Sequence, residues 1–517
     1  MAVARCHAVA LLGLDGYVVE VEADLAAGLP GLSITGLPDA ALNEARDRVK
    51  AAVVNSGIAW PSKRITLGLS PAAKPKKGSG FDLSLAAALL AAAGEVPRDA
   101  VDGLVLLGEL GLDGRVRPVP GVLPALVAAA TGGFTRAVVP AVNLAEARLL
   151  GEVASRGVAS LRELIALLKG EELADPEVPA LVAAREPDIR DFADVLGQPV
   201  GRTACEVAAA GGHNLMFTGP PGCGKTLLAE RLPGILPPLS FQESLEVSQI
   251  HSVAGTLPAD APLVTRPPFQ APHHGATPAS VVGGGSGIAK PGAASLAHRG
   301  ILFLDEAPEF HRGVLDALRQ PLESGEISIR RVGGTARYPA RFSLVLAANP
   351  CPCAKPRFSC TCRPAAREGY LTKLSGPLLD RIDLHVPLNA ITRQDMESEK
   401  HVEETSAMLL ERVLVARERA KERYAGTPWN TNADVPPTVL VRRWPLDRKP
   451  LALLGSAMDH GLLTARGFGR VQRLAWTLAD LAGHGTPTTD DASLALSLRL
   501  GDKVVQGFLP GVGRLSA

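Results

Sequence analysis

The chain has 517 residues, 46% of them hydrophobic, with 54 Lys and Arg against 53 Asp and Glu. This length predicts about three domains with sizeable cores, and the balanced charge means that any basic surface for nucleic acid must be local. The N-terminus is not a signal peptide, and the longest apolar stretches, 83–93 and 123–130, are too short to span a membrane. We therefore expect a cytoplasmic protein with no membrane partner and with its seven cysteines reduced.

Residues 1–168 combine strand and helix patterns, which predicts an α+β domain. Apolar and polar residues alternate over 17–24, directly after Asp15-Gly16, as expected for a β-hairpin with its turn there. Helical patterns follow at residues 38–56, 82–93 and 121–131. The next stretch, 169–188, is charged, contains three prolines and is typical of a linker.

Residues 219–226 fit the phosphate-binding pattern G-x-x-x-x-G-K-[ST], and they follow a short apolar run, 215–217, that predicts a strand. In such a loop, backbone N–H groups surround the phosphates, the lysine places its charge on the β and γ oxygens, and the hydroxyl ligates Mg²⁺. The predicted ATP-binding residues are Gly219, Pro220, Pro221, Gly222, Cys223, Gly224, Lys225 and Thr226.

Four apolar residues, 301–304, precede Asp305 and Glu306, the pattern of a buried parallel strand whose carboxyl end faces a site. Asp305 is expected to hold Mg²⁺ together with Thr226, and Glu306 to polarise the attacking water. Taken alone, the run also fits a core strand that ends in surface acids. Its position after a phosphate loop favours an ATPase.

Residues 327–341 predict a hairpin around Gly333-Gly334 with four arginines and no acid. We expect Arg330, Arg331 and Arg337 to contact DNA phosphates without reading bases. Aromatic residues make up only 4% of the chain, so stacking of bases on aromatic side chains is not expected to be the main means of binding DNA. A solvated hairpin without a ligand is the alternative.

Four of the seven cysteines lie within twelve residues in the pattern C-x-C-x₆-C-x-C; they are Cys351, Cys353, Cys360 and Cys362. Four thiolates suit tetrahedral Zn²⁺, whereas the tight C-x-C spacing also fits reduced structural cysteines. A structural zinc and a metal-free loop both remain open. His273 and His274 are separate from this cluster, and we expect them to contact nucleotide, DNA or backbone, with a packing role as the alternative.

Strands and helices alternate between residues 189 and 391, which predicts an α/β domain with a parallel sheet. Residues 392–517 lack strand patterns and contain helical runs at 395–424 and 467–482. We expect this last region to form a helical lid. The chain as a whole is predicted to be an α/β multidomain protein.

The order of these motifs resembles that of AAA+ ATPases. Residues 191–198, ending in Gln198, correspond to their adenine-contacting segment. Asn349, which ends the apolar run 344–348, corresponds to their sensor polar residue. The resemblance implies that both belong to the ATP site.

Residues 375–383 resemble the arginine-finger segment of the magnesium chelatase and MCM branch of AAA+ proteins. There Arg381 would reach the ATP of a neighbouring subunit, because a planar guanidinium stabilises charge on the transferred phosphoryl group. Pairing of Arg381 with Asp380 or Asp383 is the alternative. In the lid, Arg466 resembles the second sensor of this branch, with Arg470 as its substitute.

Over its whole length the chain resembles the YifB/ComM family of magnesium-chelatase-like AAA+ ATPases, most specifically in the segments 271–274, 281–285, 295–300 and 375–383. This resemblance implies a hexameric ring and a pore hairpin at residues 327–341. For ComM it implies an ATP-driven DNA branch-migration helicase that acts on single-stranded or branched DNA in recombination during natural transformation. A motor that remodels a partner protein during metal insertion, and a nucleotide-gated scaffold, are the alternatives.

The N-terminal domain resembles the Lon-protease type, a ribosomal S5 domain 2-like fold, in segments 69–72, 77–82 and 108–116. Lon proteases need a serine nucleophile and a lysine base. The serine position falls on Gly80, one residue from Ser79, and the lysine position falls near Leu123. The resemblance therefore implies a scaffold or DNA-engaging module without the catalytic dyad.

Overall fold

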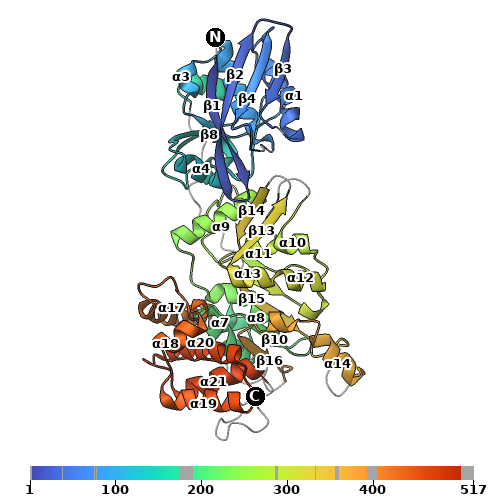
Figure 1. Ribbon diagram of the computed structural model, residues 1–517, viewed down its shortest axis with the longest axis vertical. Coiled ribbons are helices and arrows are strands. Elements are labelled where there is room, and N and C mark those ends of the chain that lie inside the picture. The colour runs from blue at the N-terminus through green and yellow to red at the C-terminus, as the bar shows by residue number, and fades with distance from the viewer. Residues whose placement is uncertain are drawn as a thin grey trace.

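The computed structural model describes residues 3–501 apart from 38, 75, 77, 174–189, 286–288, 332–333, 356–359 and 393–403. Three regions follow one another along the long axis of the molecule: an N-terminal region with a mixed sheet, a central region with a parallel sheet, and a C-terminal region of helices (Figure 1). The fold is mixed α/β with a helical C-terminal part. Most of the predicted linker, residues 174–188, lies outside the described part of the chain.

The N-terminal region contains β1 (Ala4–Leu12), β2 (Asp15–Ala26), β3 (Gly31–Thr35), α1 (Ala40–Asn55), β4 (Arg64–Ser70), α2 (Asp82–Ala93), α3 (Arg98–Val101), β5 (Val105–Leu106), β6 (Glu109–Leu110), β7 (Val116–Arg117), α4 (Val122–Thr131), β8 (Arg136–Pro140), α5 (Leu144–Ala147), β9 (Ala154–Val158) and α6 (Leu161–Leu168). Its seven-stranded sheet has the order β3-β4-β2-β1-β5-β8-β9.

The predicted hairpin is confirmed, because β1 and β2 pair antiparallel. Its turn is Gly13-Leu14, since Leu12 pairs with Asp15, and the prediction at Asp15-Gly16 is wrong by two residues. The parallel half of the sheet, β1-β5-β8-β9, was not predicted. β5 has only two residues and β8 is buried along most of its length, so neither shows the alternation that marks a half-exposed strand.

The helices of this region follow their sequence patterns closely. α2 begins and ends at the predicted residues; its alanines and leucines favour helix, and Gly94, at φ 83°, ends it in the left-handed conformation. α1 and α4 also lie within their predicted ranges. Nearly every residue of α2 is buried, so this helix forms the centre of the N-terminal core.

The central region contains α7 (Pro199–Gly211), β10 (Leu215–Thr218), α8 (Lys225–Arg231), α9 (Phe241–Ala254), β11 (Phe269–Gln270), α10 (Pro278–Val282), α11 (Ala293–Leu296), β12 (Ile301–Leu304), α12 (Arg312–Ala317), α13 (Arg319–Ser324), β13 (Glu326–Arg331), β14 (Gly334–Pro339), β15 (Ser343–Ala348), α14 (Pro364–Leu371), α15 (Gly376–Leu379) and β16 (Leu384–Pro387). Five strands form a wholly parallel sheet in the order β11-β12-β15-β10-β16.

The C-terminal region contains α17 (Ser406–Arg423), α18 (Pro437–Arg443), α19 (Arg448–Asp459), α20 (Ala465–Ala482) and α21 (Thr489–Leu500). The described part of this region has no strand, as predicted, although residues 395–403 of the first predicted helix are not described. α17, α20 and α21 share one apolar core with α7, β10 and β16. The lid is therefore packed directly on the central sheet.

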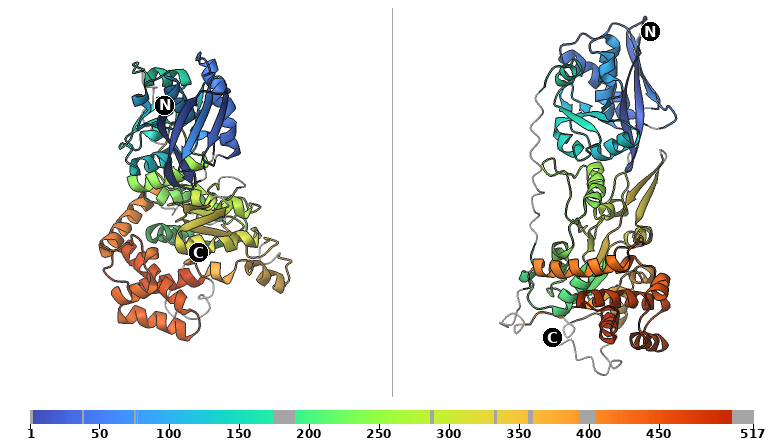
Figure 2. Two further views of the ribbon diagram at one scale, coloured as in Figure 1. Left: turned by 45° about the horizontal axis from the view of Figure 1, so that its top comes forward. Right: turned by 90° about the vertical axis from the view of Figure 1, so that its left-hand side faces the viewer.

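In the described part of the chain, the N-terminal and central regions meet at the β1–β2 hairpin and again at α9. The tip of the β1–β2 hairpin reaches the separate two-stranded hairpin β13–β14, as the right-hand view of Figure 2 shows. There Gly13 forms a bridge with Arg337. Leu12 and Leu14 pack against the apolar core beneath the central sheet. The N-terminal region thus touches the arginine-bearing hairpin directly.

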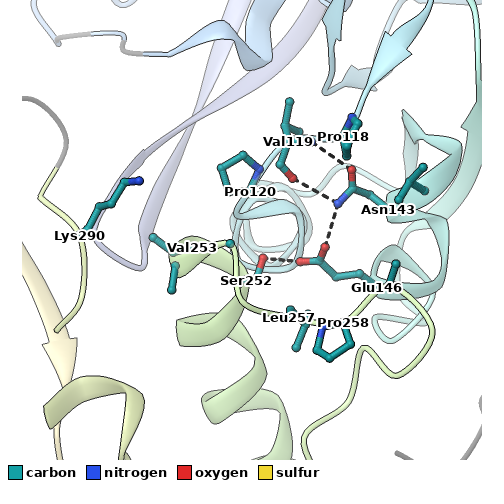
Figure 3. Close-up of a pocket in the computed structure, with 14 residues that line it drawn as sticks. Pro118, Val119, Pro120, Asn143, Glu146, Ser252, Val253, Leu257, Pro258 and Lys290 are labelled. Atoms are coloured by element: carbon teal, nitrogen blue, oxygen red, sulfur yellow. Dashed lines mark hydrogen bonds between the residues drawn. The ribbon is translucent and has the colours of Figure 1, made fainter. Parts of the chain in front are cut away.

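The second contact is polar and lines a cavity of about 330 Å³ (Figure 3). The carboxylate of Glu146, in α5, accepts hydrogen bonds from the hydroxyl of Ser252, in α9, and from the backbone N–H of Leu123 at 2.9 Å. The N–H of Gly121 also donates to the carbonyl of Ser252 at 3.1 Å. Burial raises the pKa of Glu146.

Candidate functional site

The phosphate loop connects β10 to α8 at the carboxyl end of the sheet. Gly222 and Gly224 have φ of 77° and 88°, a conformation that favours glycine. A Cβ at Gly219 would lie 2.5 Å from the carbonyl of Leu388, so a side chain has no room there. The sequence therefore needs its glycines at these positions for the loop to close.

Lys225 is buried and its amine points back into the loop. Its Nζ donates to the carbonyls of Gly219 at 2.7 Å and Pro220 at 2.9 Å, and to Asn349 Oδ1 at 3.0 Å. Asn349 follows β15 directly, and β15 pairs in parallel with β10. The predicted sensor residue and the predicted phosphate-binding lysine are therefore in contact.

Asp305 and Glu306 follow β12 at the same edge of the sheet. The hydroxyl of Thr226 donates to Asp305 Oδ2 at 2.8 Å, and these hydroxyl and carboxylate oxygens are ligands that Mg²⁺ prefers. The N–H of Glu306 donates to Asp305 Oδ1 at 2.8 Å. Glu306 has φ of 50°, an uncommon conformation for a residue other than glycine that occurs preferentially at functional sites.

A cavity of about 320 Å³ lies against these residues and is lined by Thr226, Asp305, Glu306, His273 and His274 among others. His274 Nδ1 lies 3.4 Å from Glu306 Oε2. His273 Nδ1 accepts a hydrogen bond from the N–H of Gly275 at 3.0 Å, so it stabilises its own turn. The sequence left the roles of both histidines open, and only the structure brings His274 to the predicted catalytic acid.

Gln198 lies on the same side of the sheet. It begins α7 with φ of 55°, and its Nε2 donates to the carbonyl of Asn389 at 2.6 Å. Leu388, which precedes Asn389 in the sequence, donates its N–H at 2.7 Å to the carbonyl of Thr218, the last residue before the phosphate loop. The predicted adenine-contacting segment therefore lies beside the loop.

The predicted finger arginine, Arg381, and the two predicted lid arginines, Arg466 and Arg470, lie at the amino end of the parallel strands, opposite the phosphate loop. Arg381 lies three residues before Leu384, the first residue of β16, and β16 runs parallel to β10 along all four of its residues. Arg381 therefore lies beyond the amino end of these strands, whereas the phosphate loop follows the carboxyl end of β10. Its side chain pairs with Glu323, not with Asp380 or Asp383. Burial and the nearby charges of Arg470, Arg319 and Arg466 lower the pKa of Arg381.

The two lid arginines differ in exposure. The Arg466 side chain is 82% exposed and lies 3.6 Å from Asp380. The Arg470 side chain is 18% exposed and pairs with the buried carboxylate of Asp383. Arg466 is therefore exposed enough to contact another molecule in spite of its pairing with Asp380, whereas Arg470 is held by Asp383 in the single chain.

The four clustered cysteines come together in the segment between β15 and α14. Their sulfur atoms all lie within 4.8 Å of one another, and the three distances among Cys351, Cys353 and Cys360 are 3.4–3.5 Å. Four thiolates bound to one Zn²⁺ at 2.3 Å would lie about 3.8 Å apart. The residues present therefore fit a tetrahedral zinc site.

Arg330, Arg331 and Arg337 are exposed on the hairpin β13–β14. The hairpin begins one residue earlier than predicted, at Glu326, and its carboxylate lies 3.8 Å from Arg337. The expectation of a hairpin free of acids is therefore wrong by this one residue. The prediction of a turn at Gly333-Gly334 is wrong for Gly334, which pairs with Arg331 as the first residue of β14, while Gly333 lies outside the described residues.

The predicted absence of the protease dyad concerns Gly80 and Leu123. Leu123 is fully buried, and its backbone N–H donates to the carboxylate of Glu146. Lys76, four residues before Gly80, is also fully buried and its amine donates to the carbonyls of Gly36, Leu69 and Pro71.

Among the described residues, no helix is long and apolar enough to cross a membrane.

Family models of magnesium chelatase subunit ChlI match three segments of the chain. The model described as subunit ChlI of Mg-chelatase matches residues 21–143, and that of magnesium chelatase, subunit ChlI, matches residues 191–396. The model of the ChlI C-terminal part matches residues 403–499. A shorter similarity, 30% identity over 141 residues, relates 26% of the chain to 18% of a Lon protease of Salinispora arenicola.

Full-length relatives are also found. A Mycobacterium tuberculosis protein is 53% identical over 501 residues, which cover 96% of this chain and 99% of the relative. YifB of Escherichia coli is 38% identical, with 98% of both chains covered. Competence protein ComM of Haemophilus influenzae is 38% identical, with 94% and 95% covered. The chain therefore belongs to the YifB and ComM family of magnesium-chelatase-like proteins.

Proposed function

We propose that the protein is an AAA+ ATPase that uses ATP hydrolysis to move along DNA as a ring. The observation that carries the ATPase is the meeting of Lys225, Asn349 and the Thr226–Asp305 pair at one edge of the parallel sheet. Family membership supports the AAA+ branch.

Each residue has a role in this reaction. Lys225 binds the β and γ phosphate oxygens once ATP displaces its contacts with the loop carbonyls. Thr226 and Asp305 would hold Mg²⁺, and the bound ion would supply positive charge against those oxygens. Glu306 orients and polarises the attacking water, and Asn349 fixes the position of the lysine. Gln198 borders the adenine site.

The ring follows from the position of the arginines. Arg381 and Arg466 lie at the sheet edge away from their own phosphate loop, so each subunit is expected to offer them to the ATP of its neighbour. Arg470 is assigned a supporting role at the same edge. A head-to-tail arrangement of this kind closes into a ring when the rotation between neighbours adds up to a full turn, and we propose a hexamer as in the AAA+ resemblance.

DNA is proposed as the track because the hairpin β13–β14 presents three exposed arginines, Arg330, Arg331 and Arg337. Guanidinium groups on one hairpin bind phosphates regardless of sequence. The similarity to a competence protein supports an activity on single-stranded or branched DNA in recombination, with branch migration as the motor's work.

Two further assignments complete the proposal. The four clustered cysteines hold one structural Zn²⁺, which would stabilise a segment too small to have its own core. The N-terminal region is a Lon-type domain without proteolytic activity, since Gly80 and Leu123 occupy the dyad positions. We propose that it is a scaffold docked on the hairpin through Gly13 and Leu12.

The test compares ATP hydrolysis and DNA binding of the wild type with those of the variant Arg330→Ala, Arg331→Ala, Arg337→Ala. Basal hydrolysis should persist, while DNA affinity falls for all sequences. The slope of log affinity against log salt should decrease by roughly 0.7–0.9 for each lost phosphate contact. Movement of a branched junction should stop, because a motor that does not hold its track does no work on it.

The matched control replaces three exposed cations of the lid, Arg442, Arg448 and Lys449, with alanine and should behave as wild type. Unchanged DNA affinity and junction movement in the hairpin variant would contradict the DNA motor. Because three magnesium chelatase models match the chain, a motor that remodels a partner protein during metal insertion would then be the better proposal.

A further inference from the structure

A buried polar network contacts the backbone of Arg381. Asn214 Nδ2 donates to the carbonyl of Arg381 at 2.9 Å, and the N–H of Asn214 donates to Asp383 Oδ2 at 3.2 Å. His213 Nδ1 lies 3.5 Å from the same carboxylate oxygen, within range of an electrostatic contact although the two atoms form no hydrogen bond. His213 and Asp383 are 0% and 2% exposed, so water does not compete for these contacts.

The network continues into the lid. The ring of His213 meets Thr477 of α20, with 2.7 Å between Nε2 and Oγ1. Asn432 Nδ2 donates to Thr477 Oγ1 at 3.0 Å and to Asp480 Oδ2 at 2.9 Å. Arg423, near the end of α17, pairs with Asp480. Thr477, Asn432 and Asp480 are each at most 1% exposed, so the whole path is buried.

Asp383 carries a charge at the centre of this network. Burial alone would raise the pKa of Asp383, but the contacts with His213 and Arg470 outweigh burial and lower this pKa well below its usual range. Arg470 of α20 therefore joins the lid to Asp383, which lies two residues after Arg381 in the same segment.

In a dry interior, each polar group in such a network needs its partner, because an unpaired buried donor or acceptor is costly. A shift of α20 relative to the central sheet therefore cannot leave the backbone at Arg381 unchanged. We propose that the buried network Asp383–His213–Thr477–Asn432 positions Arg381, so that the packing of the lid sets where the finger is presented to the neighbouring subunit. This inference rests on the proposed role of Arg381 in trans.

The test uses Thr477→Val, which keeps the shape of the side chain and removes its hydroxyl. With ring assembly verified by sedimentation, kcat for ATP hydrolysis should fall roughly 2- to 30-fold, the range of network couplings. KM for ATP should stay within about twofold of the wild-type value, since the phosphate loop lies at the carboxyl end of the strands and the network lies at their amino end. Thr477→Ser should restore kcat, because it restores the hydroxyl.

The control is Ser493→Ala, which removes a buried hydroxyl of α21 that has no hydrogen-bond partner in the described chain, and it should leave kcat unchanged. His213→Asn tests the same link from the core side if Thr477→Val does not fold. Asparagine is too short to reach both Asp383 and Thr477, so kcat should fall again.

The decisive measurement is the double variant Arg381→Ala, Thr477→Val. If Thr477 acts through Arg381, the double variant should hydrolyse ATP no more slowly than Arg381→Ala alone. Additive losses, or no rescue by Thr477→Ser, would overturn the positioning role. Normal kcat in Arg381→Ala would overturn the finger and this inference together, whereas a defective Arg381→Ala with an unaffected Thr477→Val would overturn only the network.

Discussion

At the scale of single residues, the proposed ATP site assigns different tasks to two side chains. Lys225 donates to two loop carbonyls and to Asn349, contacts that ATP would have to displace before the amine binds phosphate oxygens. Glu306 is half-exposed and contacts His274 instead of the loop. Binding and hydrolysis should therefore be separable by mutation.

Lys225→Ala is expected to lose ATP binding, because the main positive charge of the loop is removed. Glu306→Gln should still bind ATP but hydrolyse it slower by a factor of roughly 100 or more, since only the group that polarises water is lost. Binding of a fluorescent ATP analogue and phosphate release measure the two steps. Glu309→Gln, a nearby acid paired with Lys373, is the matched control and should behave as wild type. Wild-type hydrolysis by Glu306→Gln would refute this assignment.

At the scale of elements, the cysteine segment links β15 to α14 and begins two residues after Asn349. Bound metal would therefore stabilise the chain next to the lysine contact of the ATP site.

We expect one zinc per chain in protein purified without chelator, measured by elemental analysis. Cys360→Ser and Cys362→Ser should each lose the metal, because three thiolates leave one coordination position open. Cys205→Ala, which removes a buried cysteine far from the cluster in sequence, should retain it. Metal-free protein with four freely titratable thiols at the cluster would exclude the zinc site.

α9 illustrates a second element whose stability depends on charge. Glu246 lies 3.4 Å from His298 Nε2 and 3.1 Å from Arg299 Nη2. The hydrogen bond from His298, with the charge of Arg299, lowers the pKa of Glu246 from 4.5 to about 2. The contact therefore contributes stability above pH 4.5, and this contribution is lost as the pH falls toward 2.

Glu246→Gln should flatten the pH dependence of the free energy of unfolding between pH 4.5 and 2, measured by denaturant titration. The exposed Glu418→Gln in α17 serves as the control and should retain the wild-type slope. Identical slopes for Glu246→Gln and wild type would mean that this carboxylate does not stabilise the folded state.

At the scale of the whole molecule, the proposed catalytic site has two halves at opposite ends of the parallel strands: Glu306 at the carboxyl end and Arg381 at the amino end. Arg381→Ala and Glu306→Gln therefore spoil different sides of a subunit. Mixing the two inactive variants should restore part of the ATPase activity, because some interfaces combine an intact Arg381 with an intact Glu306. Each variant mixed with itself is the control. Full activity of a monomer at high dilution would contradict a ring with shared sites.

The sequence by itself determined the features that depend on neighbouring residues. The phosphate loop between β10 and α8 and the acids after β12 were predicted because these motifs are local, and their parallel strands place them at one edge. The bounds of α2 were predicted because helix propensity and its glycine stop signal agree. The helical C-terminal part followed from periodicity alone.

Only the tertiary structure decided which distant groups meet. The contacts of His274 with Glu306, of Arg381 with Glu323, and of His213 with Thr477 join residues 32, 58 and 264 positions apart. No local pattern encodes such pairs, because they depend on how helices pack on the sheet. The parallel half of the N-terminal sheet escaped prediction for a related reason. β5 is short and β8 is largely buried, so they lack the alternation that identifies a strand, and their partners are fixed only when the core assembles.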